Sequence, residues 1–372
     1  MKAFVWVSRI FVGVLFIISG LIKANDPVGF SYKLKEYFEV FGTEFMVPMS
    51  LSLAIFICIF EVVCGIATIF GSRMKFFSWM LLLMIVFFTF LTFYSAYFNK
   101  VTDCGCFGDA VKLTPWQSFT KDIILLIFIT PIFLYRKKIL PIFKVTKDNL
   151  ILTVGTIATT VFTLYCLWHL PVLDFRPYKV GTNLLKAMEI PEGAKPDVYK
   201  TTLVYQKDGV KKEFTTETYP WQDSTWVWVE TKNVLVEKGY QPAIHDFSLT
   251  SPDGVDQTQA LLGSTKELFL LVEYNVNKAD LDVQPDINKL AASLQKDSIK
   301  FIALTASLST DIEKFRHANQ TAYDFYTTDE KALQTMIRSN PGLVYIKNGV
   351  VVDMWHANDL PTYEKLKEKY LK

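Results

Sequence analysis

The chain has 372 residues, 51% of them hydrophobic and 15% aromatic, and its 39 Lys and Arg side chains nearly balance its 37 Asp and Glu. This apolar share is high for an ordinary soluble protein, and a net charge of +2 without a long basic tract argues against nucleic-acid binding. The long apolar runs lie in the first half of the chain. The sequence therefore predicts a membrane-embedded half followed by a water-soluble half.

Five apolar runs are long enough to cross a bilayer, which takes about 20 helical residues. They cover Phe4–Ile22, Met46–Phe70, Phe76–Phe98, Trp116–Tyr135 and Leu150–Leu170. We expect the first run to be a span and not a cleaved signal peptide, because Arg9 lies within it and no small-residue cleavage site follows Ser19-Gly20. Five crossings place the two chain ends on opposite sides of the membrane.

The basic residues of the short loops gather on one side of this arrangement. They are Lys2, Arg9, Arg73, Lys75, Arg136, Lys137, Lys138, Lys144 and Lys147. The positive-inside rule then predicts a cytoplasmic amino terminus. The loop between the third and fourth spans, and everything after Leu170, are expected on the outer side, in a compartment where disulfides persist.

The segment from Phe30 to Phe41 repeats aromatic and apolar residues on one helical face and charged residues on the other. Two interpretations fit this pattern. The helix either lies in the outer interface with its aromatic face among lipid headgroups, or it caps the bundle with that face toward the core.

Ionisable residues within spans usually have a partner or a task, because a charge in hydrocarbon is costly. Arg9 and Glu61 are both expected in the cytoplasmic halves of their spans, where they can pair. Asp122 is expected near the outer end of the fourth span, where Lys23 and Asp26 close the first. These five residues are candidates either for salt bridges that lock the bundle or for a proton or quinone site.

The loop between the third and fourth spans contains Asp-Cys-Gly-Cys-Phe-Gly-Asp at 103–109, with Cys104 and Cys106 as candidate catalytic residues. A disulfide between them would close a very small, strained ring that is easy to reduce. Gly105 and Gly108 supply the backbone freedom of a tight loop. A metal clip is the weaker idea, because two thiols are too few for a closed zinc site, and a purely structural turn is an open alternative.

The other three cysteines are predicted within spans. Cys58 and Cys64 lack the spacing of a redox pair and fit the role of small buried hydrophobes. Cys166 lies near the outer end of the fifth span, at the interface level expected for the paired cysteines. It is a candidate third thiol, with packing as the favoured alternative.

Several motifs together resemble one membrane family. They are Ser19-Gly-Leu-Ile-Lys23, Asp26-Pro-Val-Gly-Phe30, Lys33-Leu-Lys-Glu-Tyr37, Glu61-Val-Val-Cys-Gly65, Cys104-Gly-Cys-Phe-Gly108 and Lys121-Asp122. In this order they resemble the DoxX family, and within it the branch of the methylamine utilisation protein MauE. The resemblance covers roughly the first 140 residues. It implies a four-helix membrane bundle and a redox role in maturing periplasmic proteins, linked in some relatives to a quinone.

The soluble half divides into two pieces. Residues 173–241 are predicted as mostly strand, with a hairpin around Lys207-Asp208-Gly209. Residues 242–372 alternate strands and helices, with strands at 268–273, 300–305 and 323–326, helices at 286–296, 310–319 and 329–338, and a final hairpin at 343–355.

This order, with Asn340-Pro341 before the last hairpin, resembles a thioredoxin or peroxiredoxin-like domain of the TlpA type. The resemblance implies a cis peptide bond at Pro341 and a reactive cysteine after the strand that ends near Tyr274. Here the next residues are Asn275-Val-Asn-Lys-Ala-Asp280, and no cysteine follows Cys166 anywhere in the chain. The domain is therefore expected to bind or position a partner without exchanging disulfides.

The predicted architecture is multi-domain: a four-helix membrane domain (1–140), a fifth span with its linker (141–172), a β-rich region (173–241) and an α/β thioredoxin-like domain (242–372). Two functions fit it. One is a membrane thiol–disulfide oxidoreductase or accessory factor with a periplasmic protein client. The other is a non-enzymatic envelope scaffold whose inert domain recruits a partner. The four histidines show no metal-ligand spacing, so no metal is predicted.

Overall fold

The structure is a computed structural model that describes residues 2–98, 100–101, 105, 107–111, 113–195, 198–237 and 239–371. The chain forms two compact units. One consists of residues 1–182 together with 247–372, and the other of residues 183–246. The larger unit contains both the membrane helices and the thioredoxin-like domain, so the chain returns to it after the insertion.

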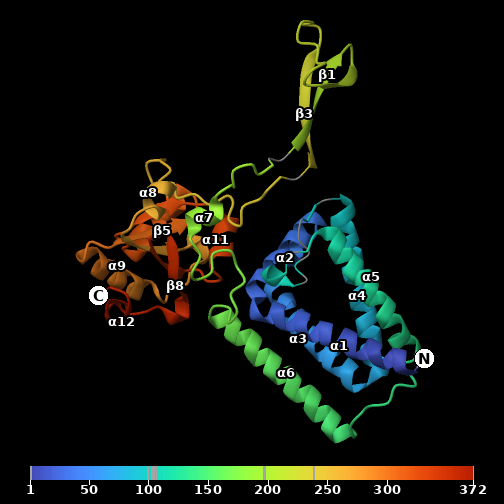
Figure 1. Cartoon of the computed structure of the whole chain (residues 1–372). Helices are drawn as coiled ribbons and strands as arrows, with labels where there is room; N and C mark the ends of the chain where they lie inside the picture. The colour runs from blue at the N-terminus through green and yellow to red at the C-terminus, as the bar shows by residue number, and fades with distance from the viewer. Residues whose placement is uncertain are drawn as a thin grey trace. The chain divides into compact units, whose positions relative to one another are not determined.

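Five long apolar helices confirm the five predicted spans (Figure 1). They are α1 (Lys2–Asn25), α3 (Ser50–Phe70), α4 (Met74–Phe98), α5 (Pro115–Leu134) and α6 (Val145–Trp168). One buried cluster joins all five, with Val12, Cys64, Leu81, Ile129 and Leu152 as one member from each. Outward residues such as Phe87 and Ile127 are exposed and apolar, as expected of helices that face lipid.

Helices α1 and α3 pack closely because glycines face each other. A Cβ built on Gly65 would lie 2.7 Å from the Gly13 carbonyl oxygen, and one on Gly13 would lie 2.8 Å from the Gly65 carbonyl oxygen. Gly20 is equally confined, because its Cβ would lie 2.7 Å from a methyl of Val62. Small residues of this kind allow the backbones of membrane helices to approach closely.

Helix α2 (Pro27–Val40) is the amphipathic segment between the first two spans. The Asp26 side chain caps it by accepting a 2.8 Å hydrogen bond from the Gly29 amide. Phe30 and Leu34 join a buried cluster with Ala54 and Cys58 of α3. This packing agrees with the second sequence interpretation, a helix that caps the bundle. A short 3-10 helix, η1 (Glu44–Met49), then leads into α3.

Contacts at the two ends of the helices define two faces of the bundle. At one end, Arg73 donates a hydrogen bond to the Asn149 side chain at 2.8 Å. At the other end, the Asn25 side chain exchanges two hydrogen bonds, of 2.8 and 2.9 Å, with the Leu173 backbone. The beginning of α6 therefore lies beside the loop between α3 and α4, and the chain beyond α6 emerges where α1 ends.

Residues 247–371 form a five-stranded sheet in the order β6-β5-β4-β7-β8. The elements are α8 (Thr258–Leu262), β4 (Glu267–Val272), η3 (Val276–Lys278), α9 (Gln284–Lys296), β5 (Lys300–Thr305), α10 (Ser309–Asn319), β6 (Asp324–Thr327), α11 (Glu330–Met336), β7 (Gly342–Lys347), β8 (Val350–His356), η4 (Ala357–Asp359) and α12 (Tyr363–Lys369). Strands β4, β5 and β6 are parallel, and β7 and β8 are antiparallel to their neighbours. The region thus resembles thioredoxin-like folds, as predicted.

The core of this domain packs α9, α10 and α12 against the sheet. Phe269, Leu294, Phe315, Tyr345 and Leu366 are among its buried members. These side chains form the apolar core between the sheet and α9, α10 and α12, while α8 and α11 bury further apolar residues of the domain. The Asn340-Pro341 peptide bond is cis, as the resemblance implied.

The second unit holds the β-rich insertion. Its elements are α7 (Leu184–Met188), β1 (Val198–Lys207), β2 (Val210–Thr215) and β3 (Val227–Glu237). The strands form an antiparallel sheet in the order β2-β1-β3. The β1–β2 hairpin turns at Asp208 and Gly209, both with positive φ, as predicted from their sequence. One face carries an aromatic cluster in which Phe214 contacts Tyr205 and Trp226.

Candidate functional site

The loop before α5 contains the two cysteines predicted to be catalytic. Cys104 and Cys106 themselves lie outside the described residues. Gly105 and Gly108 have positive φ angles of 67° and 49°, which confirms that the loop needs glycine there. A Cβ on Gly105 would lie 2.9 Å from Cγ of Lys33, so the loop passes directly against α2. The short helix η2 (Gly108–Ala110) follows and carries Asp109.

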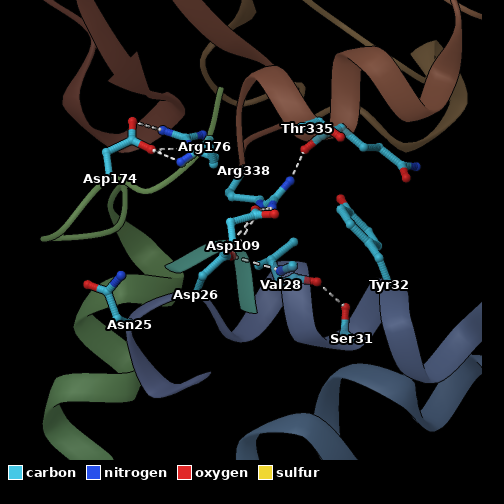
Figure 2. Close-up of polar contacts among 12 residues, drawn as sticks. Asn25, Asp26, Val28, Ser31, Tyr32, Asp109, Asp174, Arg176, Thr335 and Arg338 are labelled. Carbon is cyan, nitrogen blue, oxygen red and sulfur yellow. Dashed lines mark hydrogen bonds and ion pairs between the residues drawn. The ribbon is translucent and has the colours of Figure 1, made fainter. Parts of the chain in front are cut away.

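Asp109 and Asp26 bind one arginine of the thioredoxin-like domain, Arg338 (Figure 2). The Arg338 Nε lies 2.9 Å from Oδ2 of Asp26, and its Nη2 lies 3.2 Å from Oδ2 of Asp109. The Arg338 side chain is only 6% exposed. Burial alone would lower its pKa, but the two carboxylates outweigh burial and raise it. This ion cluster connects the loop, the cap of α2 and the domain.

Two tyrosines meet beside this ion cluster. The hydroxyl of Tyr32 on α2 donates to the hydroxyl of Tyr274, the second residue after β4, over 3.4 Å. The Arg338 guanidinium lies 5.7 Å from the centre of the Tyr32 ring, and Figure 2 shows that ring directed toward the domain. Burial raises the pKa of both tyrosines, so both keep their protons at neutral pH.

A second contact joins the domain to the end of α6. His169 Nδ1 lies 2.8 Å from the Asp359 carboxylate, and the Asn358 side-chain amide donates to the Trp168 carbonyl at 2.8 Å. The linker adds a third, because Arg176 is paired with Asp174 and donates to the Met336 carbonyl at 3.1 Å. The domain therefore contacts the membrane helices and the linker at separate points, and one of them is the last residue of α11 (Glu330–Met336).

Within the bundle, Glu61 binds Lys23 and not Arg9, which corrects the pairing expected from the sequence. The Lys23 Nζ lies 2.6 Å from Oε1 of Glu61, and both side chains are buried. Ser19 also donates to Glu61 at 3.2 Å. Lys23 reaches Glu61 because its flexible side chain extends back along α1, which a position count along two helices does not reveal.

Arg9 instead binds the carboxyl-terminal end of α3. It donates to the carbonyls of Thr68 and Ile69 at 3.0 and 2.8 Å. These are among the last carbonyls of α3, which have no partner within the helix and which carry the negative end of the helix dipole. Arg9 therefore caps α3 by binding its last carbonyls, a structural role that differs from the salt bridge expected from the sequence.

Asp122 is nearly fully buried and binds two partners. It pairs with Lys121 at 2.8 Å and accepts a 3.0 Å hydrogen bond from Thr92 of α4. It does not contact Lys23 or Asp26 in the described contacts, although the sequence placed the three at one level. Lys121 also lies 5.4 Å from the ring centre of Phe107, which directly follows Cys106. The Lys121–Asp122 pair thus adjoins the cysteine loop.

A groove of about 440 Å³ runs beside Lys121 between α1 and α5. Trp116, Gln117, Thr120, Lys121, Phe11, Leu15, Ile124 and Leu125 line it. Its polar groups come from the first turns of α5, nearest the cysteine loop, and its apolar groups from deeper in both helices. Such a lining suits an amphiphile with a polar head and an apolar tail.

The three remaining cysteines are free and buried. Cys58 and Cys64 lie in the bundle core, as expected of small buried hydrophobes. Cys166, the candidate third thiol, is 2% exposed near the end of α6. Its burial agrees with the favoured packing role.

At the end of β4, where the resemblance implied a reactive cysteine, the chain instead carries Glu273, Tyr274 and Asn275. Both carboxyl oxygens of Glu273 are buried and have no hydrogen-bond partner among the described residues. Burial raises the pKa of Glu273 to about 8, so it is mostly protonated at neutral pH. The Asn340 side chain, beside the cis proline, donates to the Asn275 carbonyl at 2.9 Å.

Sequence reasoning missed Arg338, Tyr32, Tyr274 and Glu273 as residues of interest. Two of them had a detectable signal. Arg338 lies immediately before Ser339-Asn340-Pro341, and Glu273 directly follows the five apolar residues Leu268–Val272. Tyr32 and Tyr274 had none, because their contact joins positions 242 residues apart.

Comparison with known proteins gave matches to separate parts of the chain. Residues 1–135 match the family model of methylamine utilisation protein MauE, and residues 199–238 match a domain of unknown function, DUF8463. A curated relative is Protein TlpB of Flavobacterium psychrophilum, 26% identical over 183 residues, which are 47% of this chain and 45% of the relative. The chain thus matches less than half the length of this relative.

Two solved structures are similar to about a third of the chain. One is StoA from Bacillus subtilis, at 16% identity and a TM-score of 0.27, covering 33% of this chain and 93% of that one. The other is a putative protein disulfide isomerase from Bacteroides thetaiotaomicron, at 13% identity and a TM-score of 0.28, covering 34% and 83%. At these TM-scores the matches carry no argument, and the thioredoxin-like assignment depends on the order and direction of the strands.

Proposed function

Because its first 135 residues form a MauE-like membrane domain, we propose that this chain is a membrane thiol–disulfide oxidoreductase of the bacterial inner membrane. Cys104 and Cys106 exchange a disulfide with periplasmic protein clients. The observation that carries the proposal is the loop itself. Cys104 and Cys106 stand on either side of Gly105 and before Gly108 in the sequence, and both glycines have positive φ. Asp109 of the same segment binds Arg338, and the half-buried Lys121, paired with the buried Asp122, lies beside Phe107.

One client thiolate attacks the Cys104–Cys106 disulfide, and a mixed disulfide forms as the other loop sulfur leaves as a thiolate. The second client thiolate then attacks the mixed disulfide, so the client leaves oxidised and the loop is left with two thiols. The short ring favours the first step, because strain makes the loop disulfide easier to reduce than a structural one.

Reoxidation of the loop needs a two-electron acceptor, and we assign this role to a membrane quinone. A quinone held in the membrane domain would accept the two electrons and two protons of the two loop thiols, which would form the disulfide. The groove between α1 and α5 supports this assignment. Lys121 at its polar end can donate a hydrogen bond to a quinone carbonyl, and Phe11, Leu15 and Ile124 offer the apolar surface that an isoprenoid tail requires.

The test is alkylation of native protein with and without reductant, read by mass spectrometry at both loop cysteines. Cys104→Ser and Cys106→Ser should each abolish client oxidation, and the remaining thiolate should form a mixed disulfide with a client supplied in its disulfide form. Cys58→Ser is the matched control, because Cys58 is buried in the core and should leave oxidation unchanged. The proposal fails if both loop thiols stay free under oxidising conditions and the double serine variant fully complements a deletion.

The quinone assignment has its own test. Lys121→Met should slow reoxidation of the loop by a quinone in proteoliposomes, because a hydrogen-bond donor is lost from the groove. The same variant should be reoxidised by a soluble oxidant at the rate of the unaltered chain. If the quinone reoxidises Lys121→Met and the unaltered chain at equal rates, the groove is not the quinone site.

A second candidate function is the envelope scaffold, in which the chain performs no redox step. It is favoured by the absence of cysteine after Cys166, which leaves the thioredoxin-like domain unable to exchange disulfides. Full complementation by the double serine variant would select this function over the first.

A further inference from the structure

The thioredoxin-like domain lacks thiols, but it retains the part of its fold at which α/β sheets bind ligands. Ligands of such sheets bind outside the carboxyl ends of the parallel strands, where the connections diverge to the two sides. In this domain that place is the end of β4, which has parallel β5 on one side and antiparallel β7 on the other. Tyr274 and Asn275 follow β4 there, and the cis-proline loop lies against them.

What lies at this end of the sheet is the membrane domain of the same chain. Tyr274 contacts Tyr32 of α2. The pKa of Lys35 on α2 is lowered, first by burial and then by the positive charge of Lys278 in the domain. Figure 2 shows the segments from α2 and from the loop before α5 gathered below Arg338. The contact therefore includes α2, which lies against Gly105 of the cysteine loop, and Asp109 at the end of that loop.

Arg338 supplies the chemical selectivity of this contact. Its own domain offers it the Gln334 carbonyl, whereas both of its carboxylate partners come from the membrane domain. Gly29 makes room for the guanidinium, because a Cβ at that position would lie 2.7 Å from Nη2 of Arg338. A buried guanidinium that lost these carboxylates would be left without its charge partners, so undocking is costly unless water replaces them.

We propose that the thiol-less carboxyl end of the β4–β5 sheet is a docking surface for the membrane domain of its own chain, with Arg338 as the positioning residue that recognises Asp26 and Asp109. The ligand of this thioredoxin-like domain is then the capped start of α2 together with the segment that follows the cysteine loop. The docking itself does not depend on the proposed function. Its consequence does, namely that docking holds the cysteine loop in place for a client.

The docking is tested by placing the photo-crosslinker p-benzoylphenylalanine at Tyr32 in the full chain in membranes. Illumination should join position 32 to the peptide that contains Tyr274. Arg338→Glu should reduce this product at least about tenfold, because repulsion from two carboxylates replaces a buried attraction. The pair Asp26→Asn with Asp109→Asn should reduce it likewise, and asparagine preserves the helix cap at position 26.

The matched control is Arg316→Glu, which reverses the charge of a partly exposed arginine on α10 of the same domain, paired with Glu313 of its own helix. It should leave the cross-linked product unchanged. Hydrogen exchange of β4 and β5 shows whether Arg338→Glu has unfolded the domain, and in that case the asparagine pair decides, since it leaves the domain's sequence intact. Undiminished cross-linking in the asparagine pair, or an equal loss in Arg316→Glu, would overturn the proposal.

The cross-linking is carried out in a chain with Cys104→Ser and Cys106→Ser, so it involves no thiol chemistry. If Arg338→Glu abolishes the cross-link but the loop thiols of the native chain are unreactive, the proposed function is refuted and the docking stands. If the loop thiols are reactive but Arg338→Glu leaves the cross-link unchanged, the docking is refuted and the proposed function stands.

Discussion

Lys23 and Glu61 face each other across α1 and α3 with 2.6 Å between Nζ and Oε1, and both side chains are about 3–4% exposed. A pair buried this deeply contributes little net free energy compared with apolar residues of the same size, but its separation leaves an uncompensated charge. The same holds for Arg338 between its two acids. Removing one member of such a pair should therefore destabilise the protein more than replacing both members with apolar residues.

We expect Glu61→Gln to lower the free energy of unfolding by about 3–5 kcal/mol, because Lys23 would remain buried without a counter-charge. The double variant Lys23→Met with Glu61→Leu should recover most of that loss. Thermal unfolding in detergent, compared at equal lipid content, measures both. Asp286→Asn, which breaks the exposed Lys289–Asp286 pair, is the control and should change little. A double variant as unstable as Glu61→Gln would contradict this account.

Glu273 leads to a prediction about pH. Burial raises its folded pKa to about 8, whereas an unfolded glutamate titrates near 4.3. Between these values the unfolded chain loses the proton and the folded chain keeps it, so stability should fall as pH rises from about 4 to 8. Glu273→Gln should remove this part of the dependence and stabilise the domain above pH 8. Hydrogen exchange of β4 and β5 at pH 6 and pH 8.5 measures it, and identical profiles for the two proteins would show that Glu273 is ionised when folded.

At the scale of elements, the helix contacts explain which glycines matter. Gly13 and Gly65 each face the backbone carbonyl of the other, so neither helix can move away from an added methyl group without losing the α1–α3 contact. Gly155 of α6 is also helical, but a Cβ there would meet only Cδ1 of Ile66, the far end of a flexible side chain. Gly155 should therefore tolerate an added methyl group that Gly13 and Gly65 do not, although all three are helical glycines.

Gly65→Ala should destabilise the bundle by about 1–3 kcal/mol, the usual cost of overpacking. Gly155→Ala should be neutral or slightly stabilising, since alanine is the better helix former and Ile66 can change rotamer. Thermal unfolding of both variants in the same detergent tests the contrast. Equal melting temperatures for the two would mean that α1 and α3 are less closely packed than the structure indicates.

Hairpins illustrate the opposite case, in which local sequence is sufficient. Asp208-Gly209 and Asn348-Gly349 both adopt positive φ at both residues and both close antiparallel strands, as their sequences predict. The helix bounds differ more from the prediction, since α6 begins at Val145, five residues before the apolar run. The polar first turn of α6 has no hydropathy signal, and its length is set by the contacts of Asp148 with Ser72 and of Asn149 with Arg73.

At the scale of the whole molecule, the helix bundle has two ends. The distribution of Lys and Arg predicts which of these ends faces the cytoplasm. The residues around Arg73 and Asn149 belong to the basic face. Asn25 and Leu173 belong to the face that continues into the thioredoxin-like domain. The domain and the cysteine loop are thus expected on the periplasmic side.

Single cysteines at Lys138 and Lys211, in a chain without native cysteines, test this orientation. An impermeant maleimide applied to intact spheroplasts should label position 211 and not position 138. Permeabilised cells serve as the control, in which both positions should react. Labelling at 138 alone would reverse the orientation and place the cysteine loop in the reducing cytoplasm, where a stable disulfide is not expected.

The sequence by itself determined the five spans, the thioredoxin-like strand order, both tight hairpins and the lack of thiols after Cys166, because each follows from local composition or from periodicity along one element. Tertiary structure alone decided the partners of the buried charges. Lys23 binds Glu61, Arg9 caps α3, and Arg338 binds Asp26 and Asp109. Partner choice depends on how helices rotate and cross and on how far flexible side chains reach, and these quantities are fixed by packing between segments that the sequence separates by up to 312 residues.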